Sequence, residues 1–128
     1  MSITIKTRED LLAEARSHLT LVEAERAENL ITNNALILDV REPAEFQMGH
    51  LPSAINVPRG VLEFKVGMHP QLSDPERNIL IYCKNGGRST LAAFTLMQMG
   101  FTQVEMLNGG FDSWTGDVHK VEVDPSIY

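Results

Sequence analysis

Short apolar runs alternate with segments of helical spacing along most of this chain. The apolar runs are each short enough for one buried strand, and they lie at 35–40, within 51–58, at 79–82 and at 104–107. Helical patterns with capping or turn residues occur between and after them, at 43–49, 59–64, 91–99 and 108–114. This alternation predicts an α/β fold with a mostly parallel sheet covered by helices on both faces.

The first third of the chain carries two helix-start signals. Thr7 and Asp10 precede an apolar pattern that reaches Leu19, which predicts a first helix over about 8–19. Thr20 and Glu23 have the spacing of a capping box, so a second helix is expected from there to the two asparagines at 33–34. A short strand at Ile3 and Ile5 is also expected, because both alternate with polar residues.

The only cysteine, Cys83, follows the apolar run 79–82 and precedes two glycines and a helical pattern. Gly86 and Gly87 allow successive N–H groups to point inward, and the helix start adds unpaired N–H donors that favour an anion. Lys84 and Arg88 add two positive charges. A lone cysteine is more often a small buried hydrophobe, but these surroundings favour a nucleophilic thiolate.

The carboxyl ends of parallel strands meet at one edge of a sheet, where function gathers. Asp39 with Arg41, Cys83 with its loop, and Asn108 with its glycines are expected to converge there. Asp39 and Arg41 are expected to brace the loop by hydrogen bonds or an ion pair. Phe111 and Trp114 are expected to be core aromatics under the last strand.

Composition narrows the range of functions. With 128 residues, 43% hydrophobic, the chain fits one domain, and its net charge of −6 argues against a general affinity for nucleic acid or anionic membranes. One cysteine allows neither an internal disulfide nor a cysteine-built zinc site, which suits a reducing compartment. The cytoplasm is the expected location, since no signal-peptide or membrane-span pattern is seen.

Cofactor motifs are not found in the sequence. The histidines are too scattered for a metal pair and suit surface or capping roles: His18, His50, His69 and His119. Neither phosphate-binding nor dinucleotide-binding glycine fingerprints occur. We therefore expect no metal and no cofactor.

Three segments together give a strong family resemblance. The first runs from Leu38 to Pro58 and contains Asp39-Val40-Arg41-Glu42 and Gly49-His50-Leu51; the second is Cys83-x-x-Gly86-x-Arg88-Ser89; the third is Gly109-Gly110-Phe111-x-x-Trp114. In this order and spacing, the chain resembles a single-domain rhodanese-like sulfurtransferase from about Thr20 to Trp114.

The resemblance implies a three-layer α/β sandwich with a central five-stranded parallel sheet. It places a rhodanese-like domain at 20–118, a helical N-terminal extension packed on it at 1–19, and a C-terminal tail at 119–128. It also implies that Cys83 takes the outer sulfur of a donor such as thiosulfate as a persulfide and passes it to cyanide or a thiol. The substrate would bind at the loop residues Lys84, Asn85, Gly86, Gly87, Arg88 and Ser89.

Other uses of this loop are weighed by its length. Related phosphatases and arsenate reductases place five residues between cysteine and arginine, whereas this chain has four, 84–87, which favours a single sulfur atom over phosphate. A persulfide carrier or docking module for a protein sulfur donor or acceptor is the main alternative. Arg59 is either a second cation at the pocket or an exposed helix-start residue. The acceptor must come from outside because no second cysteine exists, and the chain is expected to be a monomer or homodimer.

Overall fold

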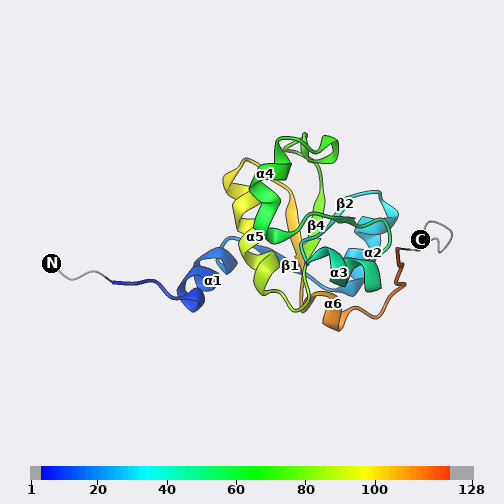
Figure 1. Cartoon of the computed structure of the whole chain (residues 1–128), viewed down its shortest axis with the longest axis horizontal. Helices are drawn as coiled ribbons and strands as arrows, with labels where there is room; N and C mark the ends of the chain where they lie inside the picture. Colours follow the sequence, from blue (N-terminus) through cyan, green and yellow to red (C-terminus); the bar gives the residue numbers. More distant parts are fainter. Residues whose placement is uncertain (1–3, 122–128) are drawn as a thin grey trace, which may run out of the picture.

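A five-stranded, wholly parallel sheet forms the centre of the computed structural model, which describes residues 4–121 (Figure 1). The strands lie in the order β1-β5-β4-β2-β3. Their bounds are Thr20–Val22 for β1, Leu36–Asp39 for β2, Ile55–Asn56 for β3, Ile79–Tyr82 for β4 and Val104–Leu107 for β5. The predicted α/β sandwich with a five-stranded parallel sheet is thus confirmed.

Helices cover both faces of the sheet (Figure 1). One face is covered by α4 and α5, with α1 beside α5; the other is covered by α2, α3 and α6. The helices are α1 (Arg8–Arg16), α2 (Ala24–Thr32), α3 (Pro43–Met48), α4 (Leu62–Val66), α5 (Gly87–Gln98) and α6 (Gly110–Ser113), with short 3-10 turns η1 (Arg59–Val61) and η2 (Pro70–Leu72). None of the helices among residues 4–121 is long and apolar enough to cross a membrane.

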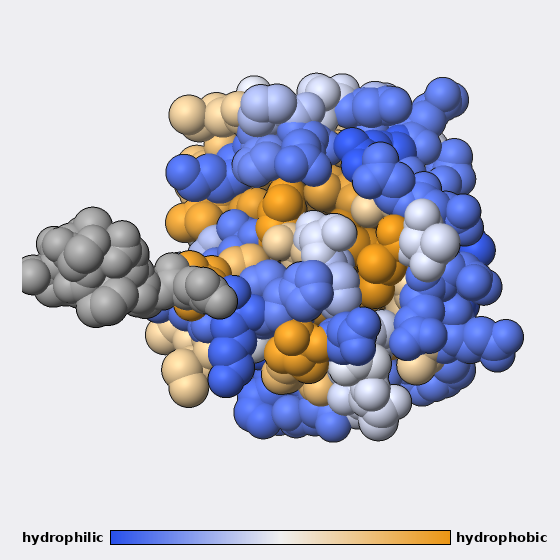
Figure 2. Space-filling view, turned by 90° about the vertical axis from the view of Figure 1, so that its right-hand side faces the viewer, coloured by the Kyte–Doolittle hydropathy of each residue, from blue (hydrophilic) through white to orange (hydrophobic). Residues whose placement is uncertain are grey.

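Successive residues of the central strands feed two separate hydrophobic cores. In β4, Ile79 and Ile81 pack towards α4 and α5, while Leu80 and Tyr82 pack towards α2. All four residues are buried, as predicted for a strand covered on both faces. On the side of the molecule that bears α2, the outer surface is largely hydrophilic, with hydrophobic residues showing between (Figure 2). Helix α2 on this side is amphipathic: Ala27 and Leu30 face the core, and its charged residues face solvent.

The capping box predicted at Thr20 was wrong, because residues 20–22 form strand β1. This strand pairs with β5, placing Val22 opposite Leu107, and α2 begins only after Glu23. Leu21 and Val22 favour an extended chain, and the ladder with β5 supplies backbone hydrogen bonds that a local helix signal cannot outweigh. The strand expected near Ile5 is not formed at that residue, and Ile3 lies outside the described residues.

Several boundaries differ from the predictions. Helix α5 begins at Gly87, so Arg88 and Ser89 are helical residues, and α6 is shorter than the predicted 108–114. Strand β3 is a half-buried edge strand instead of a buried one. The loop at 67–77 contains η2, which is anchored by buried Leu72.

Local signals that depend on neighbouring residues are confirmed. The Thr7–Asp10 capping box opens α1. Pro43 lies in the first turn of α3, and Gly49 is its C-cap. His69 caps η2 by accepting a hydrogen bond from the Gln71 N–H.

Candidate active site

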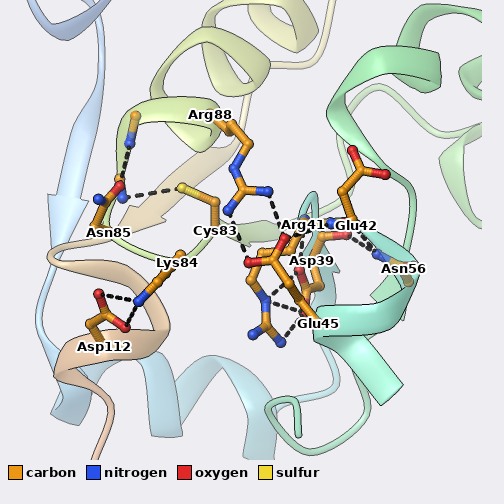
Figure 3. A network of polar contacts seen from close by, with 12 residues as sticks. Asp39, Arg41, Glu42, Glu45, Asn56, Cys83, Lys84, Asn85, Arg88 and Asp112 are labelled. Carbon is orange, nitrogen blue, oxygen red and sulfur yellow. Dashed lines mark hydrogen bonds and ion pairs between the residues drawn. The ribbon is translucent and has the colours of Figure 1, made fainter. Parts of the chain in front are cut away.

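Strand β4 delivers Cys83 to a tight loop at the carboxyl edge of the sheet (Figure 3). The Cys83 Sγ accepts the Gly86 N–H at 3.1 Å, and Gly86 has a φ of 114°, which side chains rarely adopt. Helix α5 begins at the next residue, so its positive end lies beside the sulfur. Cys83 itself is fully buried. The loop thus provides an N–H donor and a helix start for negative charge on this sulfur.

Two hydroxyl groups of α5 donate hydrogen bonds to the cysteine loop. The Ser89 and Thr90 side chains donate to the Gly86 carbonyl at 3.2 and 2.6 Å, and both are buried beside the Met106 sulfur. Ser89 was predicted to bind substrate, but its hydroxyl hydrogen-bonds to the backbone of the loop instead. The Asn85 side chain also turns back, accepting the Gly87 N–H at 3.4 Å.

The start of α6 docks directly on the loop backbone. The Phe111 and Asp112 N–H groups donate to the carbonyls of Cys83 and Lys84 at 2.8 and 2.9 Å. Gly110 makes this approach with a φ of 62° and with no room for a side chain. The third sequence motif therefore positions the cysteine loop through backbone hydrogen bonds.

Both cations of the loop are already paired with carboxylates (Figure 3). Arg88 donates to both Glu45 oxygens at 2.8 and 3.1 Å, and Lys84 does the same to Asp112 at 2.9 and 3.1 Å. The hydrogen bonds from Arg88 lower the pKa of Glu45 to about 2 and, reciprocally, those to Glu45 raise the pKa of Arg88. The positive charge expected at the loop is largely neutralised by these partners.

Asp39 and Arg41, which were expected to brace the cysteine loop, form a buried ion pair with each other. Arg41 donates to both Asp39 oxygens at 2.8 to 3.1 Å and to the Gly49 carbonyl, and its guanidinium lies 4.3 Å from the centre of the Phe111 ring. Burial is the largest single influence and lowers the pKa of Arg41, but the hydrogen bonds to Asp39, its negative charge and the nearby Tyr82 together outweigh burial and raise the pKa. The pair joins the end of β2 to α3 and α6, and within residues 4–121 it makes no hydrogen bond to the sulfur.

Two cavities flank the loop. The larger, of about 500 Å³, lies between α3 and α6 and is lined by residues that include Glu45, Met48, Lys84 and Phe111. The smaller, of about 270 Å³, lies between α1 and the start of α5 and is lined by Asn85, Arg88 and Arg59, among others. Arg59 is therefore at the pocket, although its guanidinium pairs with Glu63 at 3.0 Å.

Three residues that shape the site were missed in the sequence. Glu45 and Asp112 pair with the loop cations across 43 and 28 residues of chain. Asn56 donates from β3 to the backbone carbonyls of Asp39 and Arg41. Glu45 was visible only as a residue of the first motif, and nothing in its local pattern indicates the distant arginine.

Among the aromatic predictions, Trp114 is buried in the core beneath α2, whereas Phe111 is half-buried and lines the larger cavity. Asn108, expected to join the site, instead donates to Glu23 at 2.9 Å. The carboxyl edge of the sheet thus brings together Asp39, Arg41 and the cysteine loop.

Comparison with known proteins agrees with this architecture. The sequence model of the rhodanese-like domain family matches residues 23–117 of this chain. The chain is 35% identical over 83 residues to a sulfurtransferase of Allochromatium vinosum, covering 65% of this chain and 74% of the relative. It is 40% identical over 100 residues to the chloroplastic thiosulfate sulfurtransferase 16 of Arabidopsis thaliana, covering 69% and 80%.

Two solved structures share the fold over most of the chain. A thiosulfate sulfurtransferase from Pseudomonas aeruginosa superposes with a TM-score of 0.74 at 28% identity, covering 88% of this chain and 22% of that one. A Rhodopseudomonas palustris protein of unknown function, named a possible tyrosine phosphatase, gives 0.74 at 31% identity, covering 89% and 93%. The cysteine loop and the buried ion pair beside it agree with these matches. The chain therefore belongs to the rhodanese-like domain family, which includes its sulfurtransferase relatives.

Proposed function

We propose that this protein is a sulfurtransferase that carries a sulfane sulfur from thiosulfate to a thiophilic acceptor as a persulfide of Cys83. The observation that carries the proposal is the sulfur's setting, hydrogen-bonded to the Gly86 N–H at the start of α5. A persulfide places negative charge on its outer sulfur, and inward N–H groups with a helix N-terminus stabilise such charge.

The first step is a nucleophilic displacement at sulfur. The Cys83 thiolate bonds to the outer sulfur of thiosulfate while the S–S bond of the donor breaks, and its electron pair leaves with sulfite. In the second step, cyanide or a thiolate bonds to the outer persulfide sulfur. The Sγ–S bond then breaks, and its electron pair returns to Cys83 as the thiolate. The two steps need no outside oxidant or reductant.

The paired cations and the burial of the sulfur affect donor binding. Cys83 has no exposed surface, so side chains at the rim of the loop must move before a donor sulfur reaches it. The Glu45–Arg88 and Lys84–Asp112 pairs are partly exposed, and pairs of this kind are weak, about 0–1 kcal/mol. We infer that a donor sulfonate competes with Glu45 for Arg88 and thereby opens the rim.

Intact-protein mass spectrometry tests the cycle directly. Brief incubation with thiosulfate is expected to add one sulfur, about 32 Da, and cyanide is expected to remove it as thiocyanate. Cys83→Ser should show no gain. A sulfur adduct of the same size on Cys83→Ser would remove Cys83 from the reaction.

A persulfide carrier for a protein donor is the second candidate, and the neutralised loop cations favour it because they attract thiosulfate poorly. On this interpretation thiosulfate adds no mass, whereas a protein desulfurase loads Cys83. Phosphatase activity is less favoured, because four residues separate Cys83 from Arg88 and the short loop suits one sulfur atom. An assay with a phosphotyrosine analogue should show no turnover.

A further inference from the structure

Helix α1 lies beside the active-site loop although it precedes the residues that the family model matches. The match begins at residue 23, whereas α1 spans Arg8–Arg16 and packs along α5 (Figure 1). Ala15 is fully buried, and His18 just beyond the helix stacks on Phe94 of α5 at 5.2 Å between ring centres. These contacts fix α1 against the helix that begins at the catalytic loop.

The cavity of about 270 Å³ lies between these two helices. Arg8 and Leu12, one turn apart on the same face of α1, form one wall. Asn85, Gly87, Arg88 and Leu91 form the opposite wall, and Arg59 completes it. The cavity therefore combines three arginines with two leucines directly beside the loop that surrounds Cys83.

Arg59 is the most notable of the three arginines. Its Nε–H is buried and has no hydrogen-bond acceptor among the described residues, although such donors are nearly always satisfied in folded proteins. Its terminal nitrogens reach Glu63 at 3.0 Å and Thr95 at only 3.4 Å. A second cavity, of about 350 Å³, adjoins it on the far side along the α1–α5 groove. An anionic acceptor in the cavity would give this Nε–H a partner.

The carboxylates that pair with Arg8 and Arg59 do not close the site. Glu9 and Glu63 are both exposed and screened by water, so their pairs with Arg8 and Arg59 are weak. A carboxylate held between arginine forks, with two parallel hydrogen bonds to each, binds more strongly.

The size and lining of the cavity indicate what it holds. At about 270 Å³ it has room for a ligand larger than thiosulfate. Leucine walls with arginine forks suit a larger ligand that has a hydrocarbon part and a carboxylate.

We propose that this cavity binds the sulfur acceptor, a low-molecular-weight thiol that carries a carboxylate, with Arg8 and Arg59 binding the carboxylate. The inference rests on the proposed sulfurtransferase function. The thiolate of the bound acceptor bonds to the outer sulfur of the Cys83 persulfide, the Sγ–S bond breaks, and the acceptor leaves as its own persulfide while Cys83 regains the thiolate.

The test compares two thiols that differ only at this group, N-acetylcysteine and its amide. The protein is first loaded with thiosulfate and desalted, and loss of the added sulfur mass is then followed after each thiol is added at equal thiolate concentration. The wild type is expected to transfer to the carboxylate thiol about three- to tenfold faster than to the amide. Arg8→Gln and Arg59→Gln should each bring this ratio towards one.

Arg16→Gln is the matched control, because Arg16 lies on the same helix but does not line the cavity. It should keep the wild-type ratio. A ratio that is the same in the wild type, Arg8→Gln and Arg59→Gln would overturn the proposal. So would an equal fall in Arg16→Gln, which would indicate long-range charge alone.

Binding is measured separately from turnover, so that failure of the proposed function is recognised. If thiosulfate fails to load Cys83, S-methyl-N-acetylcysteine, which cannot react, is titrated while the methyl NMR signals of Leu12 and Leu91 are followed. Saturable shifts that the corresponding amide does not cause, and that Arg59→Gln weakens, would support the site without the thiosulfate reaction. Absence of such shifts would overturn the site itself.

Discussion

Replacing Gly110 with alanine should separate α6 from the cysteine loop. An added Cβ at this position would lie 2.6 Å from the Cys83 carbonyl oxygen and 2.7 Å from that of Lys84. Both contacts are with backbone atoms, so no flexible side chain can move aside. Gly110 also has a φ of 62°, which alanine adopts at a cost of about 1–2 kcal/mol.

The magnitude follows from these distances. Ordinary contact begins at 3.4 Å, so the two segments must move apart by about 0.8 Å. The same movement stretches the 2.8 Å hydrogen bond from Phe111 to Cys83 and the 2.9 Å hydrogen bond from Asp112 to Lys84 to roughly 3.6 Å each, which breaks both. Two lost hydrogen bonds at ~1 kcal/mol each, with the backbone strain, give a destabilisation of about 3–4 kcal/mol.

Urea denaturation followed by circular dichroism measures this loss, and thiosulfate:cyanide activity of the folded fraction measures the effect on the loop. Gly67→Ala is the control, since nothing lies within 4 Å of an added Cβ and its φ of −74° suits alanine. The control should lie within about 1 kcal/mol of the wild type. Wild-type stability and activity in Gly110→Ala would refute the reasoning that this backbone approach positions Cys83.

Three further changes test single contacts. Tyr82→Phe should lower the free energy of unfolding in urea by about 1–2 kcal/mol, because the buried Leu51 N–H donates to the Tyr82 oxygen at 3.1 Å. Burial raises the pKa of this phenol and so keeps it neutral. An unchanged urea midpoint would contradict this. Glu45 has a folded pKa of about 2 against an ordinary 4.5, so its pair adds stability that is complete above pH 4.5 and lost as the pH falls towards 2. Because about a third of each side chain in this pair is exposed, the free energy of unfolding should fall by about 1 kcal/mol instead of the ~3 kcal/mol that the full pKa shift of Glu45 implies. Glu45→Gln should remove this pH dependence. Arg88→Ala should raise KM for thiosulfate about tenfold, because Glu45 is then left as an unpaired negative charge; an unchanged KM would place the donor elsewhere.

Local patterns determined the elements whose identity depends on near neighbours. The apolar run 79–82 followed by Cys83 and two glycines predicted a strand, a loop and a helix, because such a run suits a doubly covered strand and Gly86 needs a positive φ. The motifs also predicted the fold and a structural role for Asp39 and Arg41, which lie two residues apart and pair with each other.

Tertiary structure alone decided the features that join distant segments. Residues 20–22 became a strand because β5 offered a hydrogen-bonding edge, which no local capping signal reveals. The loop cations were neutralised because α3 and α6 bring Glu45 and Asp112 within 3 Å of Arg88 and Lys84. Likewise, the cavity beside the loop exists only because α1 packs on α5. The sequence by itself thus singled out Cys83 as the candidate nucleophile, while packing between distant segments determined the charge and the space around it.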